Sequence, residues 1–264
     1  MLFRDEDQFR MSLIHVCCII LLGSSWAPQA YAQANPPLPS AEAILDRVVT
    51  VSGGQAGYDG VQNEIRMITA NVSGTAVAQI AIYRTRSGNL HQIVSGAGGQ
   101  SELGVMDGIV WSRTGDAAQI LETGEERAQA LQAAVLLSDG RWREAYKSAE
   151  MVGTETVDGT SCYVLTVVPF AGKPHTLWYD QKTGLQVKEV APHPKGGDVE
   201  MKALEYFEAG GIRMPRVLVL KSQMNGAVLT MVVDDVKFNQ PIPDSIFALP
   251  ADIERLMKKR FAAK

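Results

Sequence analysis

Cysteine is scarce in this chain. Its 264 residues include only Cys17, Cys18 and Cys162, and the first two fall within an apolar run near the N-terminus. We expect that run to be removed with a signal peptide, which leaves one cysteine. A single thiol excludes an intramolecular disulfide bond and a cysteine metal cluster. The strand-like surroundings of Cys162 favour a buried, inert thiol.

The apolar run itself, from Leu13 to Leu22, is too short to cross a bilayer as a helix. Ala30-Tyr31-Ala32 follows it, a small-x-small pattern typical of signal-peptide cleavage sites. The leader is unusual because three acidic residues at 5–7 outnumber its two arginines. We predict a signal peptide over residues 1–32, a proline-rich lead-in over 33–39 and one exported domain over 40–264.

Excess charge and catalytic motifs are also lacking. The formal net charge of −4 is mildly acidic, which argues against a nucleic-acid binder. The chain has no Gly-x-Ser-x-Gly elbow and no His-Glu-x-x-His motif. His91, His175 and His193 lie far apart in the sequence. We therefore expect no catalytic residues, no metal, no cofactor and no enzymatic activity.

Hairpin signals dominate what is present. From Ala149 to Asn239, glycine-containing turns separate strand-like runs, and glycine supplies the positive φ that tight hairpins need. The turns are Asp158-Gly159, Thr183-Gly184, Gly210-Gly211 and Asn225-Gly226. A change of alternation phase predicts a bulge near Ala203, and residues 163–168 resemble a strand covered on both faces.

The first half of the chain predicts further strands between two helices. Ser40 is placed to cap a helix that Gly53-Gly54 ends, and a second helix is expected over Glu125–Leu137. The predicted strands are Val61–Ala70, Ala76–Arg84, Leu90–Val94, Ser101–Val105 and Ile109–Arg113. A short turn of helix is expected at Trp142–Tyr146 and a basic helix at Asp252–Phe261. The fold class is α+β.

Several short motifs resemble the LolA-like outer-membrane lipoprotein-sorting superfamily. They are Ala43-Ile44-Leu45-Asp46 with Gly53-Gly54, Asp107-Gly108-Ile109-Val110-Trp111, Trp178-Tyr179-Asp180 with Thr183-Gly184-Leu185, Tyr206 with Gly211-Ile212-Arg213-Met214-Pro215, and Asn239 to Pro250. The match covers nearly all of the expected mature chain, and the motifs are structural. The sequence looks closer to an uncharacterised branch than to the carrier itself.

The resemblance implies a strongly curved antiparallel sheet, a half-open barrel with helices over its concave face. It also implies a periplasmic carrier of acyl chains or lipoproteins. On this basis we take the residues lining an apolar cavity to be Leu165, Trp178, Met201, Tyr206, Leu229 and Met231. The lid residues are then Ile44, Val48, Leu131 and Val135. The family's carrier steadies its lid with an arginine in an early strand, and Arg66, Arg84 and Arg86 are alternatives for that role.

Two functions remain open at this point. The first is a carrier or binder of a lipid or an acylated lipoprotein, in which methionines such as Met201 accept varied acyl chains. The same methionines, and Trp111, Trp142 and Trp178, would equally serve as core filling. The second function is a non-carrier envelope binding module, a sensor or assembly partner that binds a protein. Both predict at most transient membrane contact.

Overall fold

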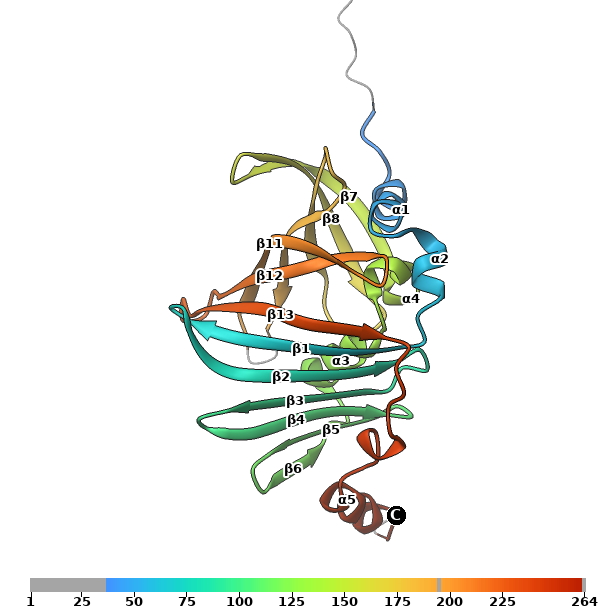
Figure 1. Cartoon of the computed structure of the whole chain (residues 1–264), viewed down its shortest axis with the longest axis vertical. Coiled ribbons are helices and arrows are strands. Elements are labelled where there is room, and N and C mark those ends of the chain that lie inside the picture. Colours follow the sequence, from blue (N-terminus) through green and yellow to red (C-terminus); the bar gives the residue numbers. More distant parts are fainter. Residues whose placement is uncertain (1–36, 194–195, 263–264) are drawn as a thin grey trace, which may run out of the picture. The chain divides into compact units, whose positions relative to one another are not determined.

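In the described part of the chain, thirteen antiparallel strands form one sheet. The structure is a computed structural model and describes residues 37–193 and 196–262. The predicted signal peptide and most of the lead-in lie outside these residues, so the predicted domain limits stay predictions. The strand order is β6-β5-β4-β3-β2-β1-β13-β12-β11-β10-β9-β8-β7 (Figure 1). Since β6 and β7 are the two edges and do not pair, the sheet is not closed.

Along the chain, the helical segment 124–145 separates the strands into two groups. The first group is β1 (Asn63–Val72), β2 (Thr75–Thr85), β3 (Leu90–Gly96), β4 (Gly99–Met106), β5 (Ile109–Thr114) and β6 (Ala117–Ile120). The second group is β7 (Tyr146–Val157), β8 (Thr160–Pro169), β9 (His175–Asp180), β10 (Gln186–Pro192), β11 (Asp198–Ala209), β12 (Ile212–Ser222) and β13 (Val228–Phe238). All four predicted hairpin turns are confirmed. The predicted bulge is confirmed too, since the β11–β12 register shifts on both sides of Glu205.

The described residues form five α-helices and two 3-10 turns. They are α1 (Ala41–Val51), α2 (Gly54–Asp59), α3 (Gly124–Ala134), η1 (Ser138–Arg141), α4 (Trp142–Ala145), η2 (Asp244–Ile246) and α5 (Ala251–Ala262). The α+β class is thus confirmed. The predictions missed α2, whose only buried side chain is Tyr58, because it has no apolar stripe. They also missed β6, which is only 4 residues long.

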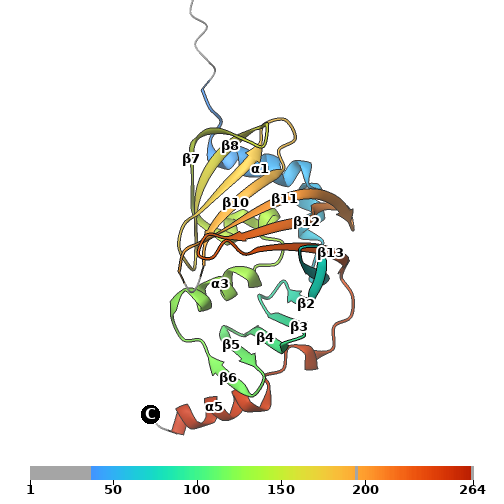
Figure 2. The same ribbon diagram turned by 90° about the vertical axis from the view of Figure 1, so that its left-hand side faces the viewer.

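Two apolar clusters lie between the helices and the sheet. The first joins α1 and α2 to β8, β9 and β12, and the second joins α3 to β1–β5 and β13. The two clusters therefore place α1 to α4 on one face of the sheet, which we call the inner face (Figure 2). Side chains alternate between faces along a strand, so every second residue of each strand points to this side.

The outer face carries a smaller cluster. Val157, Cys162, Val164 and Trp178 are buried there, while their strand neighbours Leu165 and Leu177 join the inner face. Strand β8 is therefore covered on both faces, as its sequence predicts. Cys162 is fully buried, and this burial raises the pKa of its thiol. The prediction of a buried thiol is confirmed.

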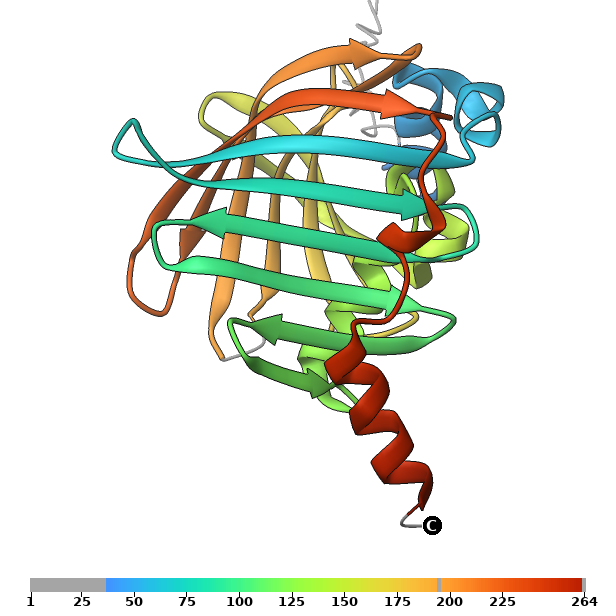
Figure 3. The same ribbon diagram turned by 60° about the horizontal axis from the view of Figure 1, so that its bottom comes forward.

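The chain after β13 crosses the ends of β1–β4 and reaches α5 beside β6 (Figure 3). In α5, Ile253 is fully buried, whereas Arg255, Lys258 and Lys259 are exposed. The predicted basic C-terminal helix is confirmed. Among the helices of the described residues, none has the length and apolar character that crossing a bilayer requires.

Candidate functional site

A cavity of about 430 Å³ lies on the inner face, between β9–β11 and the segment from α3 to η1. We call it the main cavity. Its polar lining includes Arg84, Asp139, His175 and Glu189. Its apolar lining includes Met201. The volume is within the range of about 300–1,000 Å³ that small-molecule sites occupy, and the mixed lining suits a ligand with a polar and an apolar part.

A second space adjoins the main cavity beneath helix α3. This α3 groove has a volume of about 560 Å³ and lies between α3 and β3–β5, with Val94 and Leu103 in its lining. The main cavity and the α3 groove share Gln129 and Ala133 of α3. Helix α3 therefore borders two neighbouring spaces on the inner face.

Helix α1 is held firmly. Four apolar side chains of α1 are at most 5% exposed: Ile44, Leu45, Val48 and Val49. Ile44 and Val48 are the two predicted lid residues in this helix. Its Arg47 guanidinium donates to the carbonyl oxygens of Gln181 and Lys182 at 2.8 and 2.7 Å. Its Asp46 carboxylate accepts hydrogen bonds from Trp142 and Arg143 at 2.8 to 3.0 Å. These contacts fix both faces of α1.

Helix α3 is held less firmly. Its buried side chains are Ala130 and Ala134, which bury little apolar area, and Leu131 is only half-buried. Long polar side chains reach the nearby backbone, including a bond of 2.6 Å from Gln129 to the carbonyl oxygen of Pro192. Leu137, three residues beyond α3, has φ 52° and ψ 57°. A branched residue in this left-handed region is strained, as is common where segments switch conformation.

A charged cluster lies at the junction of the two apolar clusters. Glu64 and Arg66 of β1 and Arg84 of β2 share the inner face. Glu64 is fully buried and accepts from Arg66 Nε at 2.5 Å and Arg84 Nη1 at 3.2 Å. Burial by itself would raise the pKa of Glu64, but the two guanidinium groups outweigh burial and hold the pKa below its usual value.

The opposite wall of the main cavity carries two more carboxylates. His175 Nδ1 lies 2.8 Å from Glu189 Oε1, and Gln186 donates to Glu189 Oε2 at 3.3 Å. Burial raises the pKa of Asp139 to about 6, and the neighbouring Glu189 adds to the rise while Arg66 opposes it. Asp139 thus carries a charge that its surroundings disfavour at neutral pH.

The predicted cavity residues do not all come together. Met201 lines the main cavity, and Tyr206 donates to the carbonyl oxygen of Gln186, another lining residue, at 2.7 Å. Leu229 and Met231 are half-buried against the second apolar cluster. Leu165 is fully buried in the first cluster. Trp178 lies on the outer face, where its indole donates to Glu155 at 2.8 Å.

The predicted lid residues also separate. Ile44 and Val48 are buried beneath α1, whereas Leu131 and Val135 border a third space of about 280 Å³ next to α3. Sequence reasoning selected neither Glu64 nor Asp139 for the site. One signal was present for Glu64: it lies two residues before Arg66 in a strand, so the two side chains point to the same face. Asp139 offered none, since its position depends on how the segment after α3 folds back.

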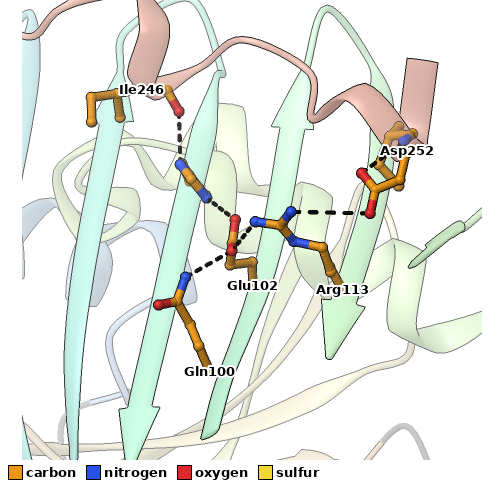
Figure 4. Close-up of polar contacts among 7 residues, drawn as sticks. Gln100, Glu102, Arg113, Ile246 and Asp252 are labelled. Atoms are coloured by element: carbon orange, nitrogen blue, oxygen red, sulfur yellow. Dashed lines mark hydrogen bonds and ion pairs between the residues drawn. The ribbon is translucent and has the colours of Figure 1, made fainter. Parts of the chain in front are cut away.

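The outer face has its own charged cluster, drawn in Figure 4. Glu102 is 7% exposed and accepts from Gln100 at 2.8 Å and from Arg113. His91 lies 3.0 Å from Glu102 and 2.7 Å from the carbonyl oxygen of Ile246. These contacts attach the C-terminal segment to β3–β5, so we assign the cluster a structural role.

The described residues hold no group of three His, Cys, Asp or Glu side chains placed to hold a metal ion. Comparisons with known proteins point to the fold. A family model described as "Uncharacterized protein" matches residues 137–251. No curated protein gives a significant match.

Solved structures are more informative. A LolA superfamily protein from Nitrosomonas europaea has a TM-score of 0.56 at 15% identity, over 80% of this chain and 99% of the other. A DUF1329 family protein from Desulfovibrio piger scores 0.54 at 13% identity, over 79% and 97%. A candidate outer membrane lipoprotein-sorting domain from Vibrio parahaemolyticus scores 0.53 at 11% identity, over 78% and 97%. The resemblance to the LolA-like superfamily is confirmed, and at these identities it shows the fold.

Replacing Glu64 by glutamine would remove the carboxylate that Arg66 and Arg84 share on the inner face. We expect Glu64→Gln to lower the free energy of unfolding by about 3–5 kcal/mol, because breaking a buried ion pair leaves uncompensated charge. Urea denaturation followed by circular dichroism measures this. Glu254→Gln, in the exposed pair with Lys258, is the control and should change stability by well under 1 kcal/mol. Equal effects of the two variants would contradict the assignment.

Asp139 should make stability depend on pH. Its pKa is raised from 3.8 to about 6 in the folded protein, so folding favours the protonated form. The stability contributed by that form is complete below about pH 4 and is lost as pH rises to about 6. Asp139→Asn should therefore stabilise the protein by about 1–3 kcal/mol above pH 6, and much less at pH 4. Urea denaturation across this range tests it, with the exposed Asp235→Asn as control. A constant difference between wild type and Asp139→Asn would rule this out.

Proposed function

We propose that this protein binds a lipid or the acyl chain of a lipoprotein on the inner face of a half-open barrel in the periplasm, as a carrier. The observation that carries the proposal is the main cavity, which joins a polar wall to apolar residues such as Met201 under a weakly held helix. The LolA-type fold, shared with a candidate lipoprotein-sorting domain, supports it.

The proposed mechanism is burial, and no chemical step is involved. Each methylene group moved from water to an apolar wall gains about 0.8 kcal/mol, so six buried methylenes gain about 5 kcal/mol. Helix α3 is the proposed lid, because its buried side chains are small and it borders both the main cavity and the α3 groove. Helix α1 is then part of the rigid wall, which narrows the lid prediction to Leu131 and Val135.

An alternative is a non-carrier binding module that holds an envelope protein. The exposed cationic residues of α5, Arg255, Lys258 and Lys259, favour this alternative because they could bind an acidic partner. Reversing these three charges leaves the inner face unchanged. A carrier should keep its lipid after the reversal, whereas a module that docks through α5 should lose its partner.

Met201 offers a direct test of the carrier proposal. Met201→Gln keeps the length of the side chain but replaces apolar lining of the main cavity with an amide. We expect a dansyl-labelled fatty acid to bind about tenfold more weakly or worse, since an apolar contact worth about 1.5 kcal/mol or more is lost. Met224→Gln is the matched control, because Met224 is 58% exposed in the β12–β13 turn. Fluorescence titration that gives equal affinities for both variants, or no binding by the wild type, would refute the proposal.

The lid assignment predicts a difference in hydrogen exchange. Backbone amides of α3 should exchange faster than those of α1 in the ligand-free protein, because α3 buries less apolar surface. Bound fatty acid should slow exchange in α3 and leave α1 unchanged. Hydrogen–deuterium exchange with mass spectrometry measures both helices in one sample, so α1 is an internal control. Slow exchange in α3 without ligand would argue against its role as a lid.

A further inference from the structure

Arg84 has hydrogen-bonding capacity that the chain does not use. Its Nη1 donates to Glu64 at 3.2 Å, while its Nε is buried without a hydrogen-bond partner. The side chain is 16% exposed and borders the main cavity. A guanidinium group has five N–H donors, and a buried donor without an acceptor is unfavourable. The exposed part of this side chain is where an added acceptor can reach the guanidinium group.

Arg84 shares its one carboxylate partner. Arg66 and Arg84 both pair with Glu64, so Arg84 has no anion of its own among the ion pairs of the described residues. Asp139 is close enough for Arg66 to lower its pKa, so Arg66 has a second anionic neighbour. Burial and the charge of Arg66 lower the pKa of Arg84, and the carboxylate of Glu64 raises it. The pKa of Arg84 stays below its usual value, and among the described residues Glu64 is the one anion that acts on it. An incoming anion would give Arg84 a second anionic partner beside Glu64.

We propose that Arg84 binds the anionic head group of the amphiphile in the main cavity, through a carboxylate or phosphate oxygen. A planar guanidinium recognises both groups by paired hydrogen bonds. This inference rests on the proposed function and specifies its ligand class. Met201 and Val199 border the same cavity, so the acyl chain has an apolar wall beside the head group.

The far wall of the main cavity limits the charge of the head group. Glu189 and Asp139 both line the cavity, and Glu189 is already engaged by His175 and Gln186. A head group with two negative charges would face repulsion from these carboxylates. The site therefore suits a singly charged group, such as a fatty-acid carboxylate or the phosphodiester of a phospholipid.

Three lauroyl ligands with different head groups test the proposal. Lauric acid carries a carboxylate, lauroyl lysophosphatidylglycerol carries a phosphodiester, and monolauroylglycerol is uncharged. Isothermal titration of the wild-type protein should show at least one anionic ligand binding about tenfold more tightly than the uncharged one. The tighter of the two anionic ligands identifies the head group. Equal binding of all three ligands would overturn the head-group inference and leave the proposed function intact.

Variants then assign the preference to Arg84. Arg84→Gln should remove the preference for the anion while binding of monolauroylglycerol persists. Arg84→Lys keeps a positive charge and should retain part of the preference for the anion. This variant tests the assignment if Arg84→Gln does not fold. Arg86→Gln is the control, since Arg86 donates to the carbonyl oxygen of Asp59 and does not line the main cavity. A preference that survives in Arg84→Gln refutes the assignment. Failure of the wild type to bind any ligand refutes the proposed function and this inference together.

Discussion

The pairing of β1 with β13 is the contact on which the rest of the structure depends. It runs from Glu64 opposite Phe238 to Asn71 opposite Thr230, with one register shift after Met67. Among the strands of the described residues, every other pair joins neighbours in sequence, so there this long-range pair alone unites the two groups of hairpins in one sheet. The segment between the groups, α3 to α4, must then lie across the shared inner face. The main cavity exists because residues of β2, β9–β11 and α3 are brought to that face together.

The charged cluster of Glu64, Arg66 and Arg84 lies where the two groups of strands meet. Two arginines in an apolar setting are costly, and Glu64 offsets most of that cost. Their positions follow from the alternation of β1 and β2, in which Glu64 pairs with Arg84 across the strands. The cluster divides the inner face into two apolar regions and gives the cavity a polar end. A sheet built only to bury a core has no need of such an arrangement.

Local patterns predicted most of the fold. Turn glycines, alternation and the Ser40 cap each act over a few residues, and the predicted strands and α1 formed as expected, with the bulge in β11 as well. The β1–β13 pairing and Asp139 in the cavity depend on contacts between distant segments, which no local pattern reveals. The predicted site shows the same limit. Met201 and Trp178 both alternate within strands, but alternation alone does not say which face of the sheet is the inner one. Met201 lines the main cavity, whereas Trp178 lies on the outer face.

The difference between α1 and α3 explains how one inner face can be both stable and accessible. Burial of four large side chains and the bonds of Arg47 and Asp46 make α1 part of the core. Helix α3 contributes small residues and borders three spaces, so its displacement exposes little apolar area of its own. In the proposed carrier, opening at α3 would therefore cost far less than unfolding, and bound acyl chains would recover that cost by burial. Because Arg84 lies in the sheet and not in the helix, its proposed contact with the head group would stay in place while the helix moves.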